Sequence, residues 1–179
     1  APEIFYNEDD DEYIIHFSAT VKADGYQKMA IYYTKTKDFE NFTMPKLFFE
    51  KACGVFDSHL VKIGDTYHLF YKTSAEPLMN MHATSNSLFG KWQHDYDFQK
   101  YMQTLYRPGS HEAATTYILP DGKWCLMLDF FGCEKEKMGY VPFISEKAGD
   151  AHFHQVNQLF SFPYGFKHGK VIEISDEEY

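Results

Sequence analysis

Four polar residues that could carry acid–base or ligand chemistry recur at nearly equal spacing along this 179-residue chain. Asp57 follows Glu3 by 54 residues, Glu112 follows Asp57 by 55, and His168 follows Glu112 by 56. Carboxylates held together can divide acid and base roles, and a histidine can carry a proton or bind a metal ion. Any one of them alone is more simply the polar start of a strand. The shared phase of Asp57 and Glu112 instead favours a common site.

The elements that must position these residues are short strands. Alternating apolar residues and turn sequences predict four strands in each period of about 55 residues. No segment has a long 3.6-residue apolar period, so we expect little helix. The predicted strands are 3–6, 13–18, 28–34 and 42–49; then 56–63, 67–73, 79–84 and about 92–96; then 113–119, 124–130, 139–144 and 153–160.

Repeated four-stranded units of this length indicate an all-β fold, the β-propeller, in which each unit is an antiparallel blade. An ordinary β-sandwich is the alternative, but it would need no fixed period. We expect blades at about 1–52, 53–107 and 108–164, with the start of the next at 165–179, as one partial propeller domain. The first strand of each blade lies innermost, so the first residues of these strands would meet at one mouth of a central channel.

Composition excludes several classes of function. The formal net charge of −9 argues against nucleic acid or an anionic membrane as partner. No apolar run is long enough to cross a membrane, and the polar start "APEIFYNEDDDEY" is not a signal peptide. The three cysteines lack metal-site spacing and are expected as free or buried thiols.

Four segments resemble the five-bladed β-propeller glycoside hydrolases of family 43, the arabinofuranosidase and xylosidase group. They are "APEIFY", "VFDSHLVKIGDTYHLFYK", "HEAATTYILPDGKWCLMLDFFG" and "GFKHGKVIEIS", in the family's order. The resemblance implies that Glu112 is the general acid and that Asp57 orients it and tunes its proton affinity. It places Glu3 in the substrate pocket. It also places His168 near the channel axis, where it contacts substrate and could reach a bound metal ion or water.

Three features depart from the family pattern. The general base of the family is an aspartate on the first blade, upstream of the "APE" segment, and no residue here matches it. We therefore expect the chain to lack the first blade. Ala113 follows the acid where the family usually has glycine. Lys167 replaces the arginine before the axial histidine, which keeps the charge but loses the planar fork.

Five further residues are candidates for binding substrate, each with a structural alternative. His59 would share a strand face with the predicted aspartate, or be a hydrogen-bonded core histidine. Lys72 could rim the pocket or lie in a solvated turn. Arg107 could bind sugar hydroxyls or lie in an exposed turn. Asp129 and Phe130 could help form a platform for sugar stacking, or pack between blades.

The function predicted from these features is inverting hydrolysis of α-L-arabinofuranosides or β-xylosides of plant polysaccharides, incomplete here without its base. A non-catalytic carbohydrate-binding or scaffold propeller is the alternative, and the sucrose- and fructan-cleaving five-bladed group stays open. The expected partner is an oligosaccharide or polysaccharide, with a missing blade or self-association covering the open blade faces. We expect no required cofactor, a possible structural calcium or sodium ion on the axis, and a secreted or periplasmic bacterial protein.

Overall fold

The computed structural model describes residues 2–75, 78–105, 110–132, 138–160, 162, 165–175 and 177. These residues form three four-stranded sheets, one α helix and two short 3-10 helices. The elements are β1 (Glu3–Asn7), β2 (Glu12–Ala19), η1 (Lys22–Asp24), β3 (Ala30–Thr36), β4 (Lys46–Phe49), β5 (Val55–Ile63), β6 (Thr66–Thr73), β7 (Asn80–Ser85), β8 (Gln93–His94), α1 (Tyr96–Thr104), β9 (Ser110–Ile118), β10 (Trp124–Phe131), β11 (Gly139–Ser145), β12 (His154–Gln155) and η3 (Asn157–Leu159).

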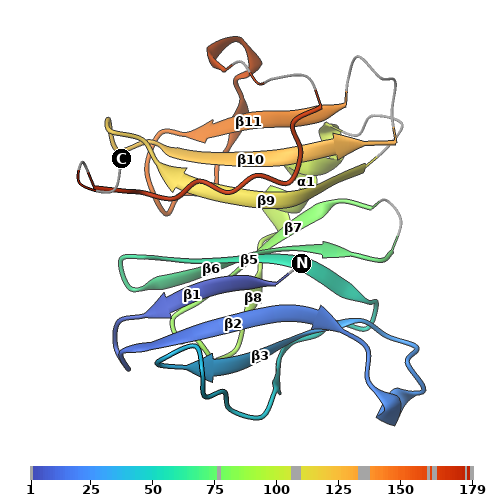
Figure 1. Cartoon of the computed structure of the whole chain (residues 1–179). Coiled ribbons are helices and arrows are strands. Elements are labelled where there is room, and N and C mark those ends of the chain that lie inside the picture. The colour runs from blue at the N-terminus through green and yellow to red at the C-terminus, as the bar shows by residue number, and fades with distance from the viewer. Residues whose placement is uncertain are drawn as a thin grey trace.

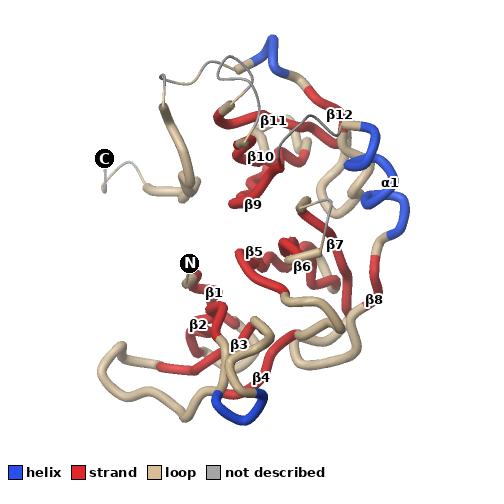
Figure 2. The backbone as a smooth tube through the Cα atoms, turned by 90° about the vertical axis from the view of Figure 1, so that its right-hand side faces the viewer, coloured by secondary structure: helices blue, strands red, loops and turns tan. Residues whose placement is uncertain are grey.

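Each sheet is an antiparallel meander of consecutive strands: β1–β4, β5–β8 and β9–β12. We number these sheets in chain order as the first, second and third blade of this chain; these numbers are separate from the blade numbers of the five-bladed family. The sheets lie one above another in chain order, with the first blade at the bottom and the third at the top (Figure 1). The first strands β1, β5 and β9 lie innermost and the last strands β4, β8 and β12 lie outermost (Figure 2). This arrangement is the predicted β-propeller, and three sheets around a centre exclude the two-sheet sandwich.

One hydrophobic core runs through all three blades. Ile14 of β2, Leu69 of β6 and Leu126 of β10 are each fully buried. Burying a side chain of this size stabilises a fold by about 1.5–3 kcal/mol. Aromatic rings join neighbouring blades, as where Phe49 of the first blade lies 4.7 Å from Tyr71 of the second, measured between ring centroids. The blades therefore stabilise one another rather than folding as separate units.

The inner strands of the second and third blades carry matching β-bulges. In β5 two residues, 57 and 58, face one residue of β6; in β9 residues 113 and 114 face one residue of β10. The first residue of each bulge has left-handed backbone, with φ of +48° at Asp57 and +53° at Ala113. His168 has the same conformation, with φ of +48°. Such backbone costs about 1–2 kcal/mol at a residue with a side chain, and bulges turn side chains toward functional sites.

The helix α1 joins the second blade to the third. The side chain of Asp95 accepts a hydrogen bond from the backbone N–H of Phe98 and so caps the helix. Phe98 and Met102, four residues apart, are buried against the blades. Among the described residues, no helix has the length and apolar character needed to cross a membrane.

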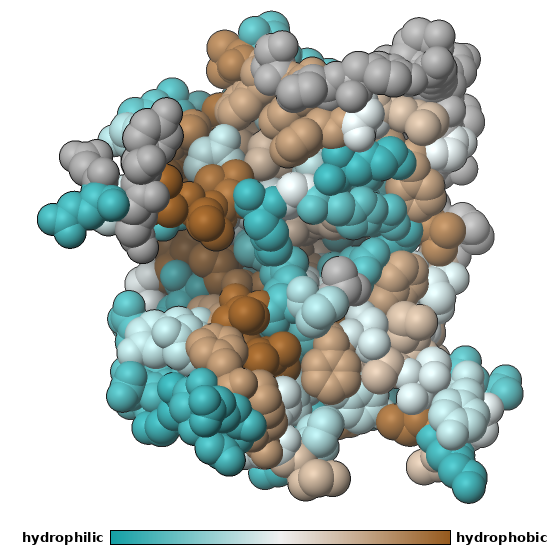
Figure 3. All heavy atoms as spheres, in the orientation of Figure 1, coloured by the Kyte–Doolittle hydropathy of each residue, from teal (hydrophilic) through white to brown (hydrophobic). Residues whose placement is uncertain are grey.

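The described residues 165–175 form an extended segment beside the third blade, opposite the N-terminal strand (Figure 1). Apolar residues gather on this side of the molecule, between the C-terminal segment and the first blade (Figure 3). Exposed apolar residues of these two parts include Ile4, Val171 and Ile172.

Candidate active site

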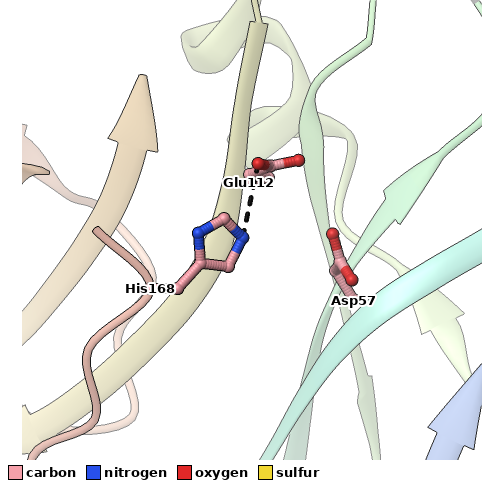
Figure 4. Close-up of side chains that lie close together, drawn as sticks. All are labelled: Asp57, Glu112 and His168. Atoms are coloured by element: carbon pink, nitrogen blue, oxygen red, sulfur yellow. Dashed lines mark ion pairs between the residues drawn. The ribbon is translucent and has the colours of Figure 1, made fainter. Parts of the chain in front are cut away.

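Three side chains from separate parts of the chain converge at the centre of the propeller. Asp57 lies on β5, Glu112 on β9 and His168 on the C-terminal segment, and all three point toward one another (Figure 4). One ligand atom from each lies within 4.8 Å of the others. A pocket of about 160 Å³ opens beside them, with Glu3 and Lys170 also in its wall. Asp57 and His168 line this pocket, and Glu112 lies next to His168 without lining it.

Glu112 is held by two basic side chains. Its Oε2 accepts a hydrogen bond of 2.8 Å from Nζ of Lys72, which belongs to the neighbouring blade. Its Oε1 lies 3.3 Å from Nε2 of His168. Both carboxylate oxygens therefore have fixed neighbours, and only Oε1 is beside the half-exposed histidine.

Asp129 lies beside the ring nitrogen of His168 that does not face Glu112. Nδ1 of the ring lies 3.2 Å from Oδ2 of Asp129, whose side chain is completely buried on β10. Burial raises the pKa of Asp129, and the nearby Glu112 adds to this, although Lys167 and His168 oppose it. The imidazole of His168 thus lies between two carboxyl groups, with one nitrogen beside Asp129 and the other beside Glu112.

A second cluster lies beneath the pocket and joins the two ends of the chain. Nε2 of His59 accepts a hydrogen bond from the backbone N–H of Thr116, and Nδ1 lies 2.9 Å from Oε2 of Glu3 and 2.7 Å from Nζ of Lys170. Lys170 donates to the other oxygen of Glu3, at 2.6 Å. Burial would raise the pKa of Glu3, but His59 and Lys170 lower it below its ordinary value. Glu3 is thus an ionised carboxylate with both oxygens engaged.

The central cluster fits a calcium or sodium ion poorly. These ions take six or more oxygen ligands, whereas the cluster offers Asp57, Glu112 and one imidazole nitrogen. The ammonium group of Lys72 also occupies one oxygen of Glu112.

The sheet register corrects one part of the sequence reasoning. The bulges place Ala113, not Glu112, at the position that matches Asp57, and Glu112 matches Phe56 instead. The assumed common phase of Asp57 and Glu112 is therefore wrong by one residue. They still come together, because each lies at the bulge of its inner strand and these strands are neighbours in space.

The other predicted residues lie at different depths. Lys72 is a buried residue of β6, 3% exposed, so the solvated turn is wrong. His59 is the hydrogen-bonded core histidine of the two alternatives, with both nitrogens engaged. Asp129 is completely buried, and Phe130 is 2% exposed and packs against His111. Arg107 lies outside the described residues.

Lys170 is the pocket residue that sequence reasoning missed. It follows the predicted axial histidine by two positions in "KHGK", so its place on the same segment was visible in the sequence. Its partner Glu3 is 167 positions away, and nothing in the sequence pairs the two.

A comparison with protein families finds one match over the whole chain. A family model described as "Probable glycosyl hydrolase domain", related to glycoside hydrolase family 43, matches residues 1–179. No curated protein sequence matches the chain.

Solved structures of glycosidases share the fold. A thermostable family-43 glycoside hydrolase is 14% identical with a TM-score of 0.61, over 87% of this chain and 53% of that one. The α-L-arabinofuranosidase of Podospora anserina, in complex with cellotriose, is 16% identical with a TM-score of 0.57, over 83% and 46%. The family-32 β-fructofuranosidase of Bombyx mori is 17% identical with a TM-score of 0.59, over 87% and 36%. The chain thus spans about half the length of these proteins or less.

Proposed function

We propose a glycosidase activity for this chain, because it belongs to the family of probable glycosyl hydrolase domains related to glycoside hydrolase family 43. The substrates we propose are α-L-arabinofuranosides or β-xylosides of plant polysaccharides. The observation that supports the proposal is the convergence of Asp57, Glu112 and His168 within 4.8 Å beside a pocket. Glycoside hydrolysis requires two carboxyl groups beside the sugar, and the cluster offers Asp57 in the pocket wall and Glu112 next to His168.

In the proposed reaction Glu112 is the general acid. Its proton passes to the glycosidic oxygen while the bond from that oxygen to the anomeric carbon breaks, and the bonding electrons stay with the departing alcohol. A water molecule adds to the anomeric carbon and gives a proton to a general base, a carboxylate to which we assign no residue of this chain. Glu112 ends the step as a carboxylate, and the ammonium group of Lys72 at 2.8 Å stabilises that charge.

Asp57 is proposed to orient the acid and the sugar. An inverting pair needs about 6.5–9.5 Å between acid and base so that a water fits. One carboxylate oxygen of Asp57 lies within 4.8 Å of one of Glu112, which is too close for that water. Asp57 is therefore proposed to orient the acid rather than to act as the base. Proton NMR of the first anomer formed tests this role of Asp57. Retention of configuration at the anomeric carbon would instead make Asp57 a nucleophile.

The experiment that tests the activity is hydrolysis of aryl α-L-arabinofuranoside and aryl β-xyloside. We expect Glu112→Gln to lower kcat by about 100-fold or more, the range for loss of a general acid. Glu146→Gln is the matched control, since Glu146 is a largely exposed carboxylate outside the site. Turnover that is equal in the parent and in Glu112→Gln would overturn the assignment.

A carbohydrate-binding function without hydrolysis is the second candidate. The observation that favours it is that both oxygens of Glu112 and both oxygens of Glu3 already have basic neighbours. Calorimetric titration with arabino- and xylo-oligosaccharides separates the two functions. Binding without turnover in the parent, unchanged in Glu112→Gln, would support this second candidate.

A further inference from the structure

Lys72 has surroundings that are unusual for a lysine. The residue is 3% exposed and lies on β6, the second strand of its blade. Its Nζ lies 5.2 Å from the ring centroid of Phe56 and 4.3 Å from that of Phe131. Burying an ammonium group is costly unless a carboxylate and aromatic faces compensate for lost water. Its carboxylate partner is Glu112, at 2.8 Å, on the next blade.

This ion pair decides how the carboxyl group of Glu112 is turned. The last torsion of a glutamate side chain is broad and would otherwise let the two oxygens exchange places. The ammonium group holds Oε2, which leaves Oε1 beside His168. The lysine itself is too deeply buried to contact a sugar, so it acts through Glu112 rather than on the substrate.

We propose that Lys72 is a positioning residue, which holds Oε2 of Glu112 so that Oε1 is the oxygen that transfers the proton. The proposal rests on the function proposed above for Glu112. Phe56 and Phe131 provide two walls around the ammonium group, and the carboxylate provides the third. A planar, wider guanidinium keeps the charge and can still bind one oxygen, whereas methionine keeps the packing between the rings and loses the ion pair.

Leaving-group dependence distinguishes this role from a general structural one. A 4-nitrophenyl leaving group departs with little help from an acid, whereas an unsubstituted phenyl group needs the proton. We expect Lys72→Met to lower kcat for the phenyl glycoside at least about tenfold more than for the 4-nitrophenyl glycoside, and Lys72→Arg to recover most of the loss. Equal losses on both substrates, or a change confined to KM, would overturn the proposal.

The matched control is Lys62→Met. Lys62 also pairs with a carboxylate, Asp9 at 2.9 Å, and lies 5.3 Å from the ring centroid of Tyr67, but it lies near the opposite end of the β5–β6 strand pair from Lys72. We expect its rates on both substrates to equal those of the parent. A selective loss on the phenyl substrate in this variant would mean that the effect is not specific to Lys72, and would overturn the proposal.

Two further measurements separate this proposal from the proposed function. If Glu112→Gln shows no leaving-group dependence, Glu112 is not the acid, and the proposed function fails whatever Lys72→Met does. Crystal structures of Lys72→Met and Lys72→Arg test the positioning without turnover. We expect the carboxylate of Glu112 to turn in the methionine variant and to keep its place in the arginine variant. An unmoved carboxylate in Lys72→Met would overturn the positioning role.

Discussion

Replacing His68 tests whether a buried histidine network weakens this fold in acid. His68 is 2% exposed, and its Nδ1 lies 3.0 Å from Nε2 of His82. Nδ1 of His82 lies 2.8 Å from a carboxylate oxygen of Asp95. Since His82 donates to this carboxylate, its Nε2 must accept the proton of His68. The other nitrogen of His68 is buried without a partner among the described residues, so a second proton there would have no acceptor.

The expected loss of stability follows from the pKa of His68. Burial, and after it the neighbouring His82, lowers this pKa from 6.5 to about 4. The unfolded chain therefore binds a proton at pH values where the folded chain does not, and stability falls as the pH falls. The contribution is complete above about pH 6.5, declines toward about pH 4 and is absent below it. At about pH 5 the loss from this one residue is about 2 kcal/mol.

The assay is urea unfolding followed by tryptophan fluorescence at about pH 7.5 and about pH 5. Asparagine can donate to His82 but does not titrate, so His68→Asn should lose about 2 kcal/mol less free energy of unfolding over this range than the parent. His152→Asn is the control, because His152 is exposed and Asp150 raises its pKa. Because the folded chain binds the proton of His152 more tightly than the unfolded chain does, this variant should lose at least as much stability as the parent. An equal loss in His68→Asn and the parent would refute the neutral, buried histidine.

Three further changes have expected outcomes that urea unfolding can measure. Ala113→Gly should stabilise the protein by about 0.5–1 kcal/mol, because glycine removes the strain of the left-handed backbone. The larger conformational entropy that glycine loses on folding offsets only part of this gain. A destabilised variant would contradict the prediction. Asp95→Ala should cost about 2–3 kcal/mol, since it removes the cap of α1 and leaves His82 without its acceptor, whereas Asp95→Asn should cost less. Lys170→Met should cost about 1–2 kcal/mol and speed hydrogen exchange in residues 165–175, because Glu3 loses one of its partners; unchanged exchange would show that the link does not hold the segment.

The inner and middle strands could be predicted from the sequence because their signal is local. The run predicted at 56–63 is β5 at Val55–Ile63, and the run predicted at 124–130 is β10 at Trp124–Phe131. The outer strands were predicted too long, as where 153–160 contains β12 at His154–Gln155 and then η3. An outer strand has one neighbour, so fewer hydrogen bonds and less burial fix where it ends. The helix α1 escaped notice because only two of its nine residues, Phe98 and Met102, are buried.

The convergence of Asp57, Glu112 and His168 was foreseen from spacing, but their neighbours were not. Whether a strand contains a bulge depends on its register with the next strand, and the residues of one strand alone do not determine that register. No glycine marks either bulge, so the phase shift at Ala113 had no local signal. The burial of Lys72 depends on two rings and a carboxylate from other strands, which is a property of tertiary packing.

The bulges of β5 and β9 shift the alternation of side chains along each strand by one residue. The bulge residues line the pocket, at Asp57 and Ser58 of β5 and at Ala113 and Ala114 of β9, and after each bulge the regular alternation of side chains resumes. One added residue therefore changes which of the following side chains face each side of the sheet. Substitutions at the rim need no compensating change in the pattern of the core, and the core can be repacked without turning a carboxylate away from the centre. The inner strands thus let a pocket diversify in its chemistry while the scaffold stays constant.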